Sequence, residues 1–284
     1  MASMRDIKRR RSSIQSTQQI TKAMKLVSTV KLQKAKNRAE ETNPYFNHMY
    51  QTVCSILKRS GTINHPYLKE SASQKKAVVV ITSNRGLAGG YNSNVVKLVT
   101  ESGFPKEDLE IYAIGNKGKD TLTRRGYSVV SDDSAVIDAP VYEDAAEICK
   151  RVLKAYQEEE IGEIYLAYTH FKNTVSHEPT LMKLLPVEID EADMTEDSNI
   201  LMNYEPNDEE ALDMIIPKYI TSLFYGALVE AVASENGARM QAMDSATSNA
   251  EEMISDLSLK YNRARQGSIT QELTEIIAGA SAIS

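Results

Sequence analysis

The sequence predicts an α/β domain set between two long helices that pair as an antiparallel coiled coil, and three observations support this fold class. Residues 217–284 contain no proline beyond Pro217 and no cluster of turn residues, so a continuous helix here would be about 100 Å long. The first 60 residues carry a second long amphipathic pattern. Between the two, short β-branched runs alternate with helical segments, which is typical of an α/β layer with a largely parallel sheet.

The N-terminal helix is expected over residues 1–60, with its regular part from about residue 5 to residue 58. Asn43-Pro44 should kink or break it, because proline lacks a backbone N–H and restricts the residue before it. Six apolar side chains recur at helical or near-helical intervals and predict one apolar face: Ile7, Ile14, Ile20, Met24, Val27 and Val30.

The net charge of −6 is divided unevenly along the chain. Residues 1–38 hold eleven Lys or Arg and one acidic residue, whereas residues 188–213 hold eleven acidic residues and no basic one. Such asymmetry is typical of segments that bind different partners. A solvated face, an acidic protein partner and nucleic acid are the alternatives for the basic segment. Nucleic acid is disfavoured, because the segment has no interleaved aromatic residues and the chain has a pI of 5.4.

The α/β domain is expected over residues 75–190 and begins with a β-branched run that is typical of a buried strand. A glycine-containing turn at 83–90 separates this run from the first helix of the domain. The strands are expected at 77–82, 109–114, 127–130 and 164–169, and the helices at 92–101, 119–125 and 142–160. Residues 180–187 would add an edge strand or a hairpin with the last of these strands. The alternation makes the domain Rossmann-like.

An acidic connection is expected over residues 191–216, followed by the C-terminal helix over 217–284. A single core cannot cover so long a helix, so it must lie against another one. Small side chains at steps of three and four predict the face that does so: Ala227, Ala231, Ser234, Ala238, Ala242, Ser245 and Asn249. Packing the two terminal helices together, antiparallel or nearly so, is the simplest way to bury both faces. The uncharged apolar end, 276–283, suggests insertion into an apolar environment.

The residues predict no catalytic site, no cofactor and no metal site. Gly86, Gly89 and Gly90 follow the first expected strand, where a dinucleotide-binding loop would lie, but their spacing is not G-x-G-x-x-G and no Walker lysine follows. A tight strand-to-helix turn explains these glycines better, since glycine permits positive φ. The four histidines lack metal-ligand spacing. Arg85, beside the glycines, fits either anion binding or a salt bridge between domains.

Cysteine usage and hydropathy indicate a cytosolic protein without a membrane span. Cys54 and Cys149 are the only cysteines and form no C-x-x-C pattern, so we expect two reduced thiols. No run of 18 or more apolar residues occurs. The first residues lack the apolar core of a signal peptide.

Three stretches of the sequence resemble the gamma subunit of the F-type ATP synthase, and the resemblance covers essentially the whole chain. The first is T-Q-Q-I-T-K-A-M-K-L-V at residues 17–27, and the second is S-N-R-G-L-A-G-G-Y-N at residues 83–92. The third is A-S-E-N-G-A-R-M-Q-A-M at residues 233–243, followed by Y-N-R-A-R-Q at 261–266 and I-T-Q-E-L-T-E-I at 269–276. Together these stretches are far more specific than one short motif.

The resemblance implies a central rotor shaft that performs no bond chemistry. Its terminal helices would form an antiparallel coiled coil inside a hexamer of alternating alpha and beta subunits. Its α/β part would lie outside, against the epsilon subunit and the membrane c-ring. The shaft would couple H⁺ or Na⁺ flow through the c-ring to ATP synthesis or hydrolysis at the beta subunits. No transit segment and no chloroplast-type cysteine insertion is evident, which favours a peripheral protein on the cytoplasmic face of a bacterial cell membrane.

The resemblance also implies which residues contact other subunits. Lys22, Met24 and Lys25 would face acidic lever loops of the beta subunits, where exposed ion pairs are worth about 0–1 kcal/mol each. Arg239 and Met240 would lie across from the Met24 region. Six further positions match contacts with beta subunits higher up the shaft: Arg265, Gln266, Thr270, Gln271, Glu272 and Glu275. The apolar end of the chain would run in an apolar sleeve of the hexamer.

Two positions depart from the family pattern and two glycines weaken the C-terminal helix. Arg11 stands where an apolar residue is usual, so we expect the lower coiled coil to be looser or hydrated there. Asn84 stands where aspartate is usual, which argues against a fixed role for a carboxylate. Gly237 and Gly267 each cost a helix about 1 kcal/mol relative to alanine, so we expect a more compliant shaft at these points.

Two alternative functions stay open on the residues alone. One is a coiled-coil scaffold with an α/β head in another assembly, and the other is a nucleotide-dependent α/β enzyme with helical extensions. An equilibrium nucleotide-binding measurement on the isolated chain separates the enzyme from the others, because the rotor predicts no specific binding.

Overall fold

The computed structural model describes residues 4–60, 65–69, 71, 73–174, 176–187 and 208–283. The helices are α1 (Met4–Ser60), α2 (Tyr91–Thr100), α3 (Asn116–Arg124), α4 (Tyr142–Gln157) and α5 (Asp208–Ile283), with short 3₁₀ helices η1 (Pro66–Leu68), η2 (Lys106–Asp108) and η3 (Val136–Asp138). The strands are β1 (Lys76–Ile81), β2 (Leu109–Ile114), β3 (Ser128–Asp132), β4 (Glu163–Phe171) and β5 (His177–Leu185). The chain divides into two compact units: Met1–Ser28 with Met240–Ser284, and Thr29–Arg239.

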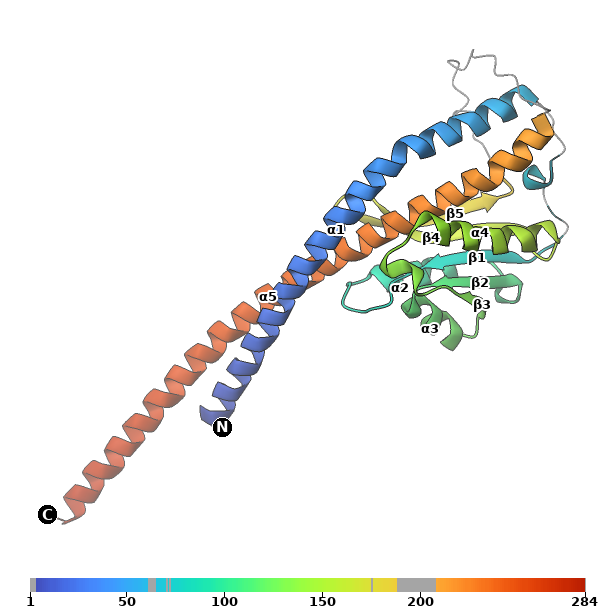
Figure 1. Ribbon diagram of the computed structural model, residues 1–284. Helices are drawn as coiled ribbons and strands as arrows, with labels where there is room; N and C mark the ends of the chain where they lie inside the picture. The colour runs from blue at the N-terminus through green and yellow to red at the C-terminus, as the bar shows by residue number, and fades with distance from the viewer. Residues whose placement is uncertain are drawn as a thin grey trace. The chain divides into compact units, whose positions relative to one another are not determined.

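The larger unit, Thr29–Arg239, is built on a five-stranded sheet in the order β3-β2-β1-β4-β5 (Figure 1). Strands β1 to β4 are parallel, and β5 runs antiparallel to β4 as the sheet's last strand. On the central strand, Val79 lies opposite Tyr112 of β2 and Leu166 of β4. The predicted α/β layer, its largely parallel sheet and the hairpin at one edge are thus confirmed.

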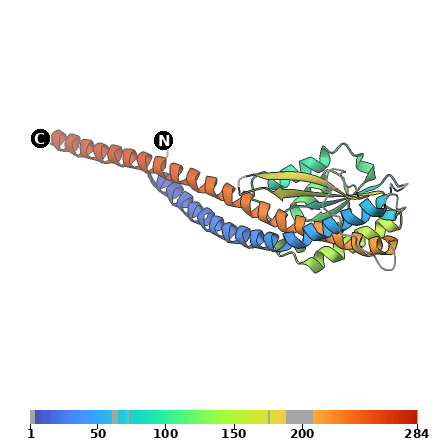
Figure 2. The same ribbon diagram turned by 90° about the horizontal axis from the view of Figure 1, so that it is seen from above.

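Both faces of the sheet are buried because side chains of β1 alternate between two apolar clusters. Ala77, Val79 and Ile81 belong to the cluster that α4 and the first part of α5 cover. Val78 and Val80 belong to the cluster that α2 and α3 cover. These helices can be followed on the two sides of the sheet in the second view (Figure 2). A continuous β-branched run is what a parallel strand buried on both faces requires.

Helix α5 begins at Asp208, so the helix start predicted at Pro217 is wrong. Proline removes one backbone donor, the one that would bond the carbonyl of Asp213, and the Asp213 side chain is two-thirds exposed. Leu212 and Ile216, which lie on either side of Asp213 in the sequence, are fully buried in the sheet cluster. Burial of these side chains stabilises the turns before Pro217 by more than the missing hydrogen bond costs.

Helix α1 also continues through its proline, so of the kink or break predicted at Asn43-Pro44 the break does not occur. Pro44 is exposed, and the carbonyl that loses its partner belongs to the exposed Glu40, so water can satisfy it. Beyond this point Val53 is fully buried, with Met49 and Tyr50 packed against the same cluster. Tertiary packing therefore keeps the helix intact past the proline.

Two sequence predictions fall partly outside the described residues. The acidic connection at 191–216 lies outside them as far as residue 207, and its remainder is already part of α5. The side chain of Cys54 is likewise outside the description. Cys149 is a buried free thiol, and burial raises its pKa to about 12, so the thiol stays protonated near neutral pH.

One described helix, α5, contains an 18-residue window that is apolar enough to cross a membrane by length and composition. However, 56% of that window is buried inside the protein. A helix that covers one face of a sheet passes the same test. The lack of a membrane span therefore stays a prediction, and α5 gives only weak evidence against it.

Candidate functional site

The smaller unit, Met1–Ser28 with Met240–Ser284, pairs the start of α1 with the end of α5 through polar side chains. Three hydrogen-bonded pairs join the helices: Gln18 Nε2 to Glu251 Oε1 (3.0 Å), Thr21 Oγ1 to Thr247 Oγ1 (2.8 Å), and Lys25 Nζ to Asp244 Oδ1 (2.5 Å). Residue numbers rise along α1 as they fall along α5, each in steps of three or four. The two helices therefore run antiparallel, as predicted, with an unusually polar contact.

Arg11 is accommodated in this contact by an aromatic partner. Its guanidinium carbon lies 5.6 Å from the centre of the Tyr261 ring, and both side chains are half-buried. A cation over a tyrosine face contributes about 0.5–1 kcal/mol at a partly exposed site. The looser packing expected at Arg11 is thus offset by a specific contact.

The apolar face predicted on α1 does not coincide with its buried face. Ile20, Val27 and Val30 are 60%, 58% and 58% exposed. The positions buried in their place follow heptad-like steps and are mostly small or polar: Thr21, Ser28, Leu32 and Ala35. Two long helices in contact follow a period near 3.5 residues, and small side chains let the helices approach closely. The exposed apolar side chains remain available to another molecule.

The small-residue stripe on α5 is confirmed in its first part and wrong in its last. Ala227, Ala231 and Ser234 are buried, but Ser245 and Asn249 are exposed. Met243 and Ala250 are buried in this part of the helix, and they lie seven residues apart. A separation of seven residues over two turns is the 3.5-residue period of paired helices, whereas the steps of the predicted stripe average a longer period and therefore leave the buried face.

The three predicted contact residues on α1 differ in accessibility. Lys22 is exposed, whereas Met24 and Lys25 are half-buried. Lys25 forms an ion pair with Asp244 within the chain, so its ammonium would have to exchange one carboxylate for another to meet a partner. Both side chains are more than one-third exposed, and such a pair contributes at most about 1 kcal/mol.

All six predicted contact residues near the end of α5 are exposed: Arg265, Gln266, Thr270, Gln271, Glu272 and Glu275. Gln271 Nε2 donates to Glu275 Oε1 at 2.9 Å within the helix. Among them lie apolar side chains that are equally uncovered. Ile269, Leu273 and Ile276 are 48%, 54% and 67% exposed and recur at steps of four and three. An amphipathic stripe of this kind is typical of a helix that packs against another surface.

Arg239 forms a buried ion pair that the sequence reasoning missed. Its guanidinium lies 2.7 Å from Glu235 Oε1, and the two side chains are only 11% and 12% exposed. Arg239 also donates to the carbonyl of Gly86 in the turn after β1, at 3.4 Å. Burial raises the pKa of Glu235, and the positive charge of Arg239 opposes this rise. The spacing of four residues on one helix is the signal that would have revealed the pair.

Met240 is half-buried, and the placement of Arg239 and Met240 across from Met24 stays a prediction.

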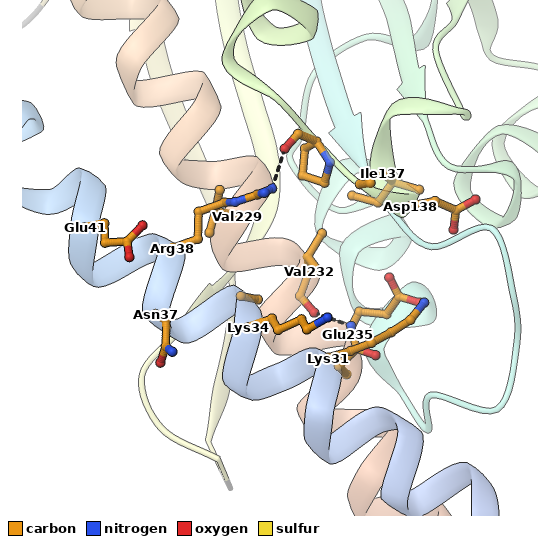
Figure 3. A pocket seen from close by; sticks show the side chains of 14 residues that line it. Lys31, Lys34, Asn37, Arg38, Glu41, Ile137, Asp138, Val229, Val232 and Glu235 are labelled. Carbon is orange, nitrogen blue, oxygen red and sulfur yellow. Dashed lines mark hydrogen bonds between the residues drawn. The ribbon is translucent and has the colours of Figure 1, made fainter.

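Near Arg239, a cavity of about 520 Å³ opens between α1, α5 and η3 (Figure 3). Lys31, Lys34 and Arg38 line it from α1, and Arg38 donates to the carbonyl of Pro140 at 2.8 Å. Three acidic residues line the same cavity and balance these charges: Glu41, Asp138 and Glu235.

The turn after β1 is held by its own side chains. The backbone N–H of Ser83 donates to Asn92 Oδ1 at 2.9 Å, and the Ser83 hydroxyl donates to the carbonyl of Arg85 at 2.6 Å. Leu87 and Gly89 adopt positive φ angles. These features fit the strand-to-helix turn that was predicted. The Arg85 side chain is exposed, and its anion-binding or salt-bridge role stays open.

Asn84 uses both ends of its amide, so we predict that Asn84→Asp destabilises the domain by about 1–3 kcal/mol. Its Nδ2 donates to the carbonyl of Ser134 at 2.7 Å and to Asp138 Oδ2 at 3.3 Å. Its Oδ1 accepts from the backbone N–H of Asn116 at 3.1 Å. An aspartate would lose both donations and face a second carboxylate. Urea unfolding measures the loss.

Asn37→Asp is the matched control, because Asn37 accepts a hydrogen bond from Gln33 through Oδ1 and an aspartate keeps that role. We expect its free energy of unfolding to change by less than about 0.5 kcal/mol. An Asn84→Asp chain as stable as this control would contradict the role assigned to the amide.

Among the described residues, no group of three or more His, Cys, Asp or Glu side chains is placed to hold a metal ion.

The comparisons with known proteins agree on one family. The family model described as ATP synthase matches residues 3–283. The ATP synthase gamma chain of Lachnoclostridium phytofermentans is 70% identical, with 100% of each chain covered. The chain belongs to the ATP synthase gamma-chain family.

Other relatives extend the match. A sodium-ion-specific ATP synthase gamma chain of Acetobacterium woodii is 39% identical over 99% of this chain and 98% of its own. In the central stalk and c-ring structure of the Tetrahymena thermophila mitochondrial ATP synthase, one chain has a TM-score of 0.60 and 26% identity, with 80% of this chain and 99% of that chain covered. The gamma chain is the rotor of the central stalk in the F-type ATP synthase and is not itself catalytic.

The two helix glycines of the gamma chain have different surroundings. A Cβ at Gly237 would lie 2.7 Å from His177 Cε1, so this glycine lets α5 approach β5 closely. Gly267 has no atom within 4 Å of the same position. Only Gly267 therefore isolates the effect of glycine on helix stiffness.

We predict that Gly267→Ala stiffens the shaft in torsion, because alanine favours the helix by about 1 kcal/mol. The stiffness can be measured from angular fluctuations of a bead attached to the rotor. Gly279→Ala, which is equally free of neighbours but near the helix end, is the control. Equal stiffness of Gly267→Ala and the parent chain would remove the role proposed for this glycine.

Proposed function

We propose that this gamma chain turns inside a hexamer of alternating alpha and beta subunits and transmits torque between a membrane c-ring and the catalytic sites on beta. The exposed end of α5 carries the proposal. Its apolar side chains Ile269, Leu273 and Ile276 are about half-exposed or more within the chain. Exposed apolar stripes on helices mark surfaces that another molecule covers. An apolar sleeve in the hexamer would cover this one and still allow rotation, since few hydrogen bonds would have to break.

The exposed face of α1 would supply a second contact with the beta subunits. Lys22 offers an exposed cation close in sequence to the exposed Ile20 and Val27. Exposed ion pairs are weak, so each contact with an acidic loop can be exchanged for the next as the shaft turns. The predicted roles of Met24, Lys25, Arg239 and Met240 belong to the same proposal.

The remaining partners follow from the same function. In the Tetrahymena structure, the related chain is part of a central stalk with a c-ring. We infer that the α/β domain of this chain contacts an epsilon subunit and a c-ring. The complex would then lie at the cytoplasmic face of a bacterial cell membrane, with the gamma chain as a peripheral component.

Reconstitution with alpha and beta subunits tests this function directly. We expect one gamma chain per hexamer and multisite ATP hydrolysis that depends on its presence. Failure to assemble, or hydrolysis that does not respond to the gamma chain, would favour the coiled-coil scaffold instead.

A shorter chain locates the contacts made by the end of α5. Removing residues 265–284 deletes six of the predicted contact residues but leaves the hydrogen-bonded pairs with α1 intact. We expect this chain to assemble and to produce roughly half the torque, if the contacts share the load about equally. Rotation against viscous drag measures it. Undiminished torque would exclude the end of α5 as a contact surface.

A further inference from the structure

A second cavity in the larger unit has no part in the rotor function described so far. It has a volume of about 540 Å³ and lies where α1, α5 and the start of α4 meet the β4–β5 hairpin. Its size falls in the range of small-molecule sites. The side chains that line it differ in character from those of the cavity beside Glu235.

Four tyrosines line this second cavity, which we term the tyrosine cavity: Tyr45, Tyr142, Tyr168 and Tyr225. The rings of Tyr142 and Tyr225 meet edge to face, with their centres 5.8 Å apart at 74°. Tyr168 is buried, and burial raises the pKa of its phenol, so it stays neutral. Aromatic faces carry negative potential, and rings from several directions attract a cation.

The charged side chains of the tyrosine cavity are acidic. Glu41 of α1 and Glu230 of α5 line it, and none of its described lining residues is Lys or Arg. His170 is the basic group among the described lining residues, and its Nδ1 lies 2.7 Å from Glu230 Oε2. Glu41 lines the cavity beside Glu235 as well, but that cavity differs because three basic side chains, Lys31, Lys34 and Arg38, also line it. The tyrosine cavity therefore favours a positively charged ligand.

We propose that the tyrosine cavity binds an organic cation, a small molecule with a protonated amine or quaternary ammonium group. The ammonium group would lie near Glu41 and the tyrosine rings, where cation–π contacts add to the attraction of the carboxylate. Apolar parts of the ligand would lie on Met182, Leu223 and Ala227. Mg²⁺ and Ca²⁺ fit less well, since they require about six oxygen ligands at short distance.

Binding of choline to the full gamma chain tests the proposal. Ligand-observed NMR at 150 mM KCl would follow choline and 3,3-dimethylbutan-1-ol, a neutral molecule of nearly the same shape. We expect saturable choline binding at least tenfold tighter than that of the alcohol. No saturable binding, or equal binding of the two ligands, would overturn the proposal.

Two neighbouring glutamates provide matched variants. Glu41→Gln removes a charge from the cavity, and we expect choline affinity to fall three- to tenfold. Glu40→Gln changes the next residue of α1, which pairs with Lys36 and does not line the cavity. We expect it to bind choline as the parent chain does. Circular dichroism would confirm that both variants are folded, since both positions are exposed. Equal effects of the two changes would contradict the assigned site.

A quaternary ammonium group occurs both in dissolved molecules and on lipid headgroups. The cavity lies between packed helices and a sheet, which favours a dissolved ligand. We therefore expect no cosedimentation of the gamma chain with phosphatidylcholine vesicles. Cosedimentation that Glu41→Gln abolishes and Glu40→Gln preserves would overturn the assignment to a dissolved ligand.

Discussion

Gly115→Ala is expected to destabilise the α/β domain by about 4 kcal/mol or more, the largest effect of any single substitution considered. Gly115 follows β2 with a φ of +98°, where a residue with a Cβ is strained by about 1–2 kcal/mol. An added Cβ would also lie 2.0 Å from the carbonyl oxygen of Thr82, at the end of β1. Because the clash is with a backbone oxygen at the buried end of a strand, a change of side-chain conformation cannot relieve it.

The position of Gly115 is sensitive because hydrogen bonds join the ends of β1 and β2 there. The backbone N–H of Thr82 donates to the carbonyl of Ile114 at 2.7 Å. The Thr82 hydroxyl donates to the carbonyl of Gly115 at 3.1 Å and accepts from the N–H of Gly118 at 2.9 Å. Pushing Gly115 away would disturb all three bonds.

Variants at two other glycines separate the two causes of the lost stability, backbone strain at positive φ and the clash with the Thr82 carbonyl. Gly103 has a φ of +79° but no atom near the position of a Cβ, so Gly103→Ala measures backbone strain alone, about 1–2 kcal/mol. Gly86 has neither a positive φ nor a neighbour within 4 Å, so Gly86→Ala should change little. Urea unfolding, with hydrogen exchange of the β1 and β2 amides, gives the three values. If Gly115→Ala costs no more than Gly103→Ala, the backbone clash is absent.

The sheet was predictable because its strands are coded by local residue patterns. The β-branched run Ala77–Ile81 needs burial on both faces, and the structure supplies an apolar cluster on each. The antiparallel pairing of the long helices was also predictable, since neither can be covered alone. Family membership rests on long motifs, and 70% identity to a gamma chain confirms it.

The packing details were not predictable from one sequence, because each depends on a partner element. Ile20 and Val27 are strongly apolar yet exposed, whereas the small and polar Thr21 and Ser28 are buried. Pro217 lies inside α5 because burial of neighbouring apolar side chains outweighs one lost hydrogen bond. In both cases tertiary contact overrides the local signal.

The buried ion pair Glu235–Arg239 leads to the second large expected effect. Replacing Arg239 by methionine keeps an apolar stem but leaves the Glu235 carboxylate without its partner in a site only 12% exposed. Breaking a buried pair from one side costs about 3–5 kcal/mol. We expect a loss near the lower end of this range, because Lys31 also lies close enough to stabilise the carboxylate.

The double variant, Glu235→Gln with Arg239→Met, is the matched control. It removes both charges, so no uncompensated carboxylate remains. Replacing a whole buried pair by neutral side chains is often neutral or stabilising. We therefore expect the double variant to be more stable than Arg239→Met alone, which a sum of two independent losses would not give.

The pH dependence of the unfolding free energy of Arg239→Met tests the role of Arg239 independently, and the direction of the change can be predicted. Burial already raises the pKa of Glu235 above its ordinary value, and removing Arg239 raises it further. The folded state then binds the proton of Glu235 more tightly than the unfolded state does. Glu235 therefore lowers the free energy of unfolding as the pH rises from its pKa in the unfolded state to its higher pKa in the folded state. Lowering the pH from 7 toward the ordinary Glu pKa, about 4.3, should therefore narrow the gap in unfolding free energy between Arg239→Met and the double variant.

The difference in unfolding free energy between these two variants removes the contributions of the other charged groups, because both chains carry them. Urea unfolding at pH 7, 6 and 5 would measure it. A gap that does not change with pH would mean that Glu235 is already protonated at pH 7 or that it reaches solvent once Arg239 is gone. Either result would show that Arg239 does not hold a buried carboxylate in its charged form.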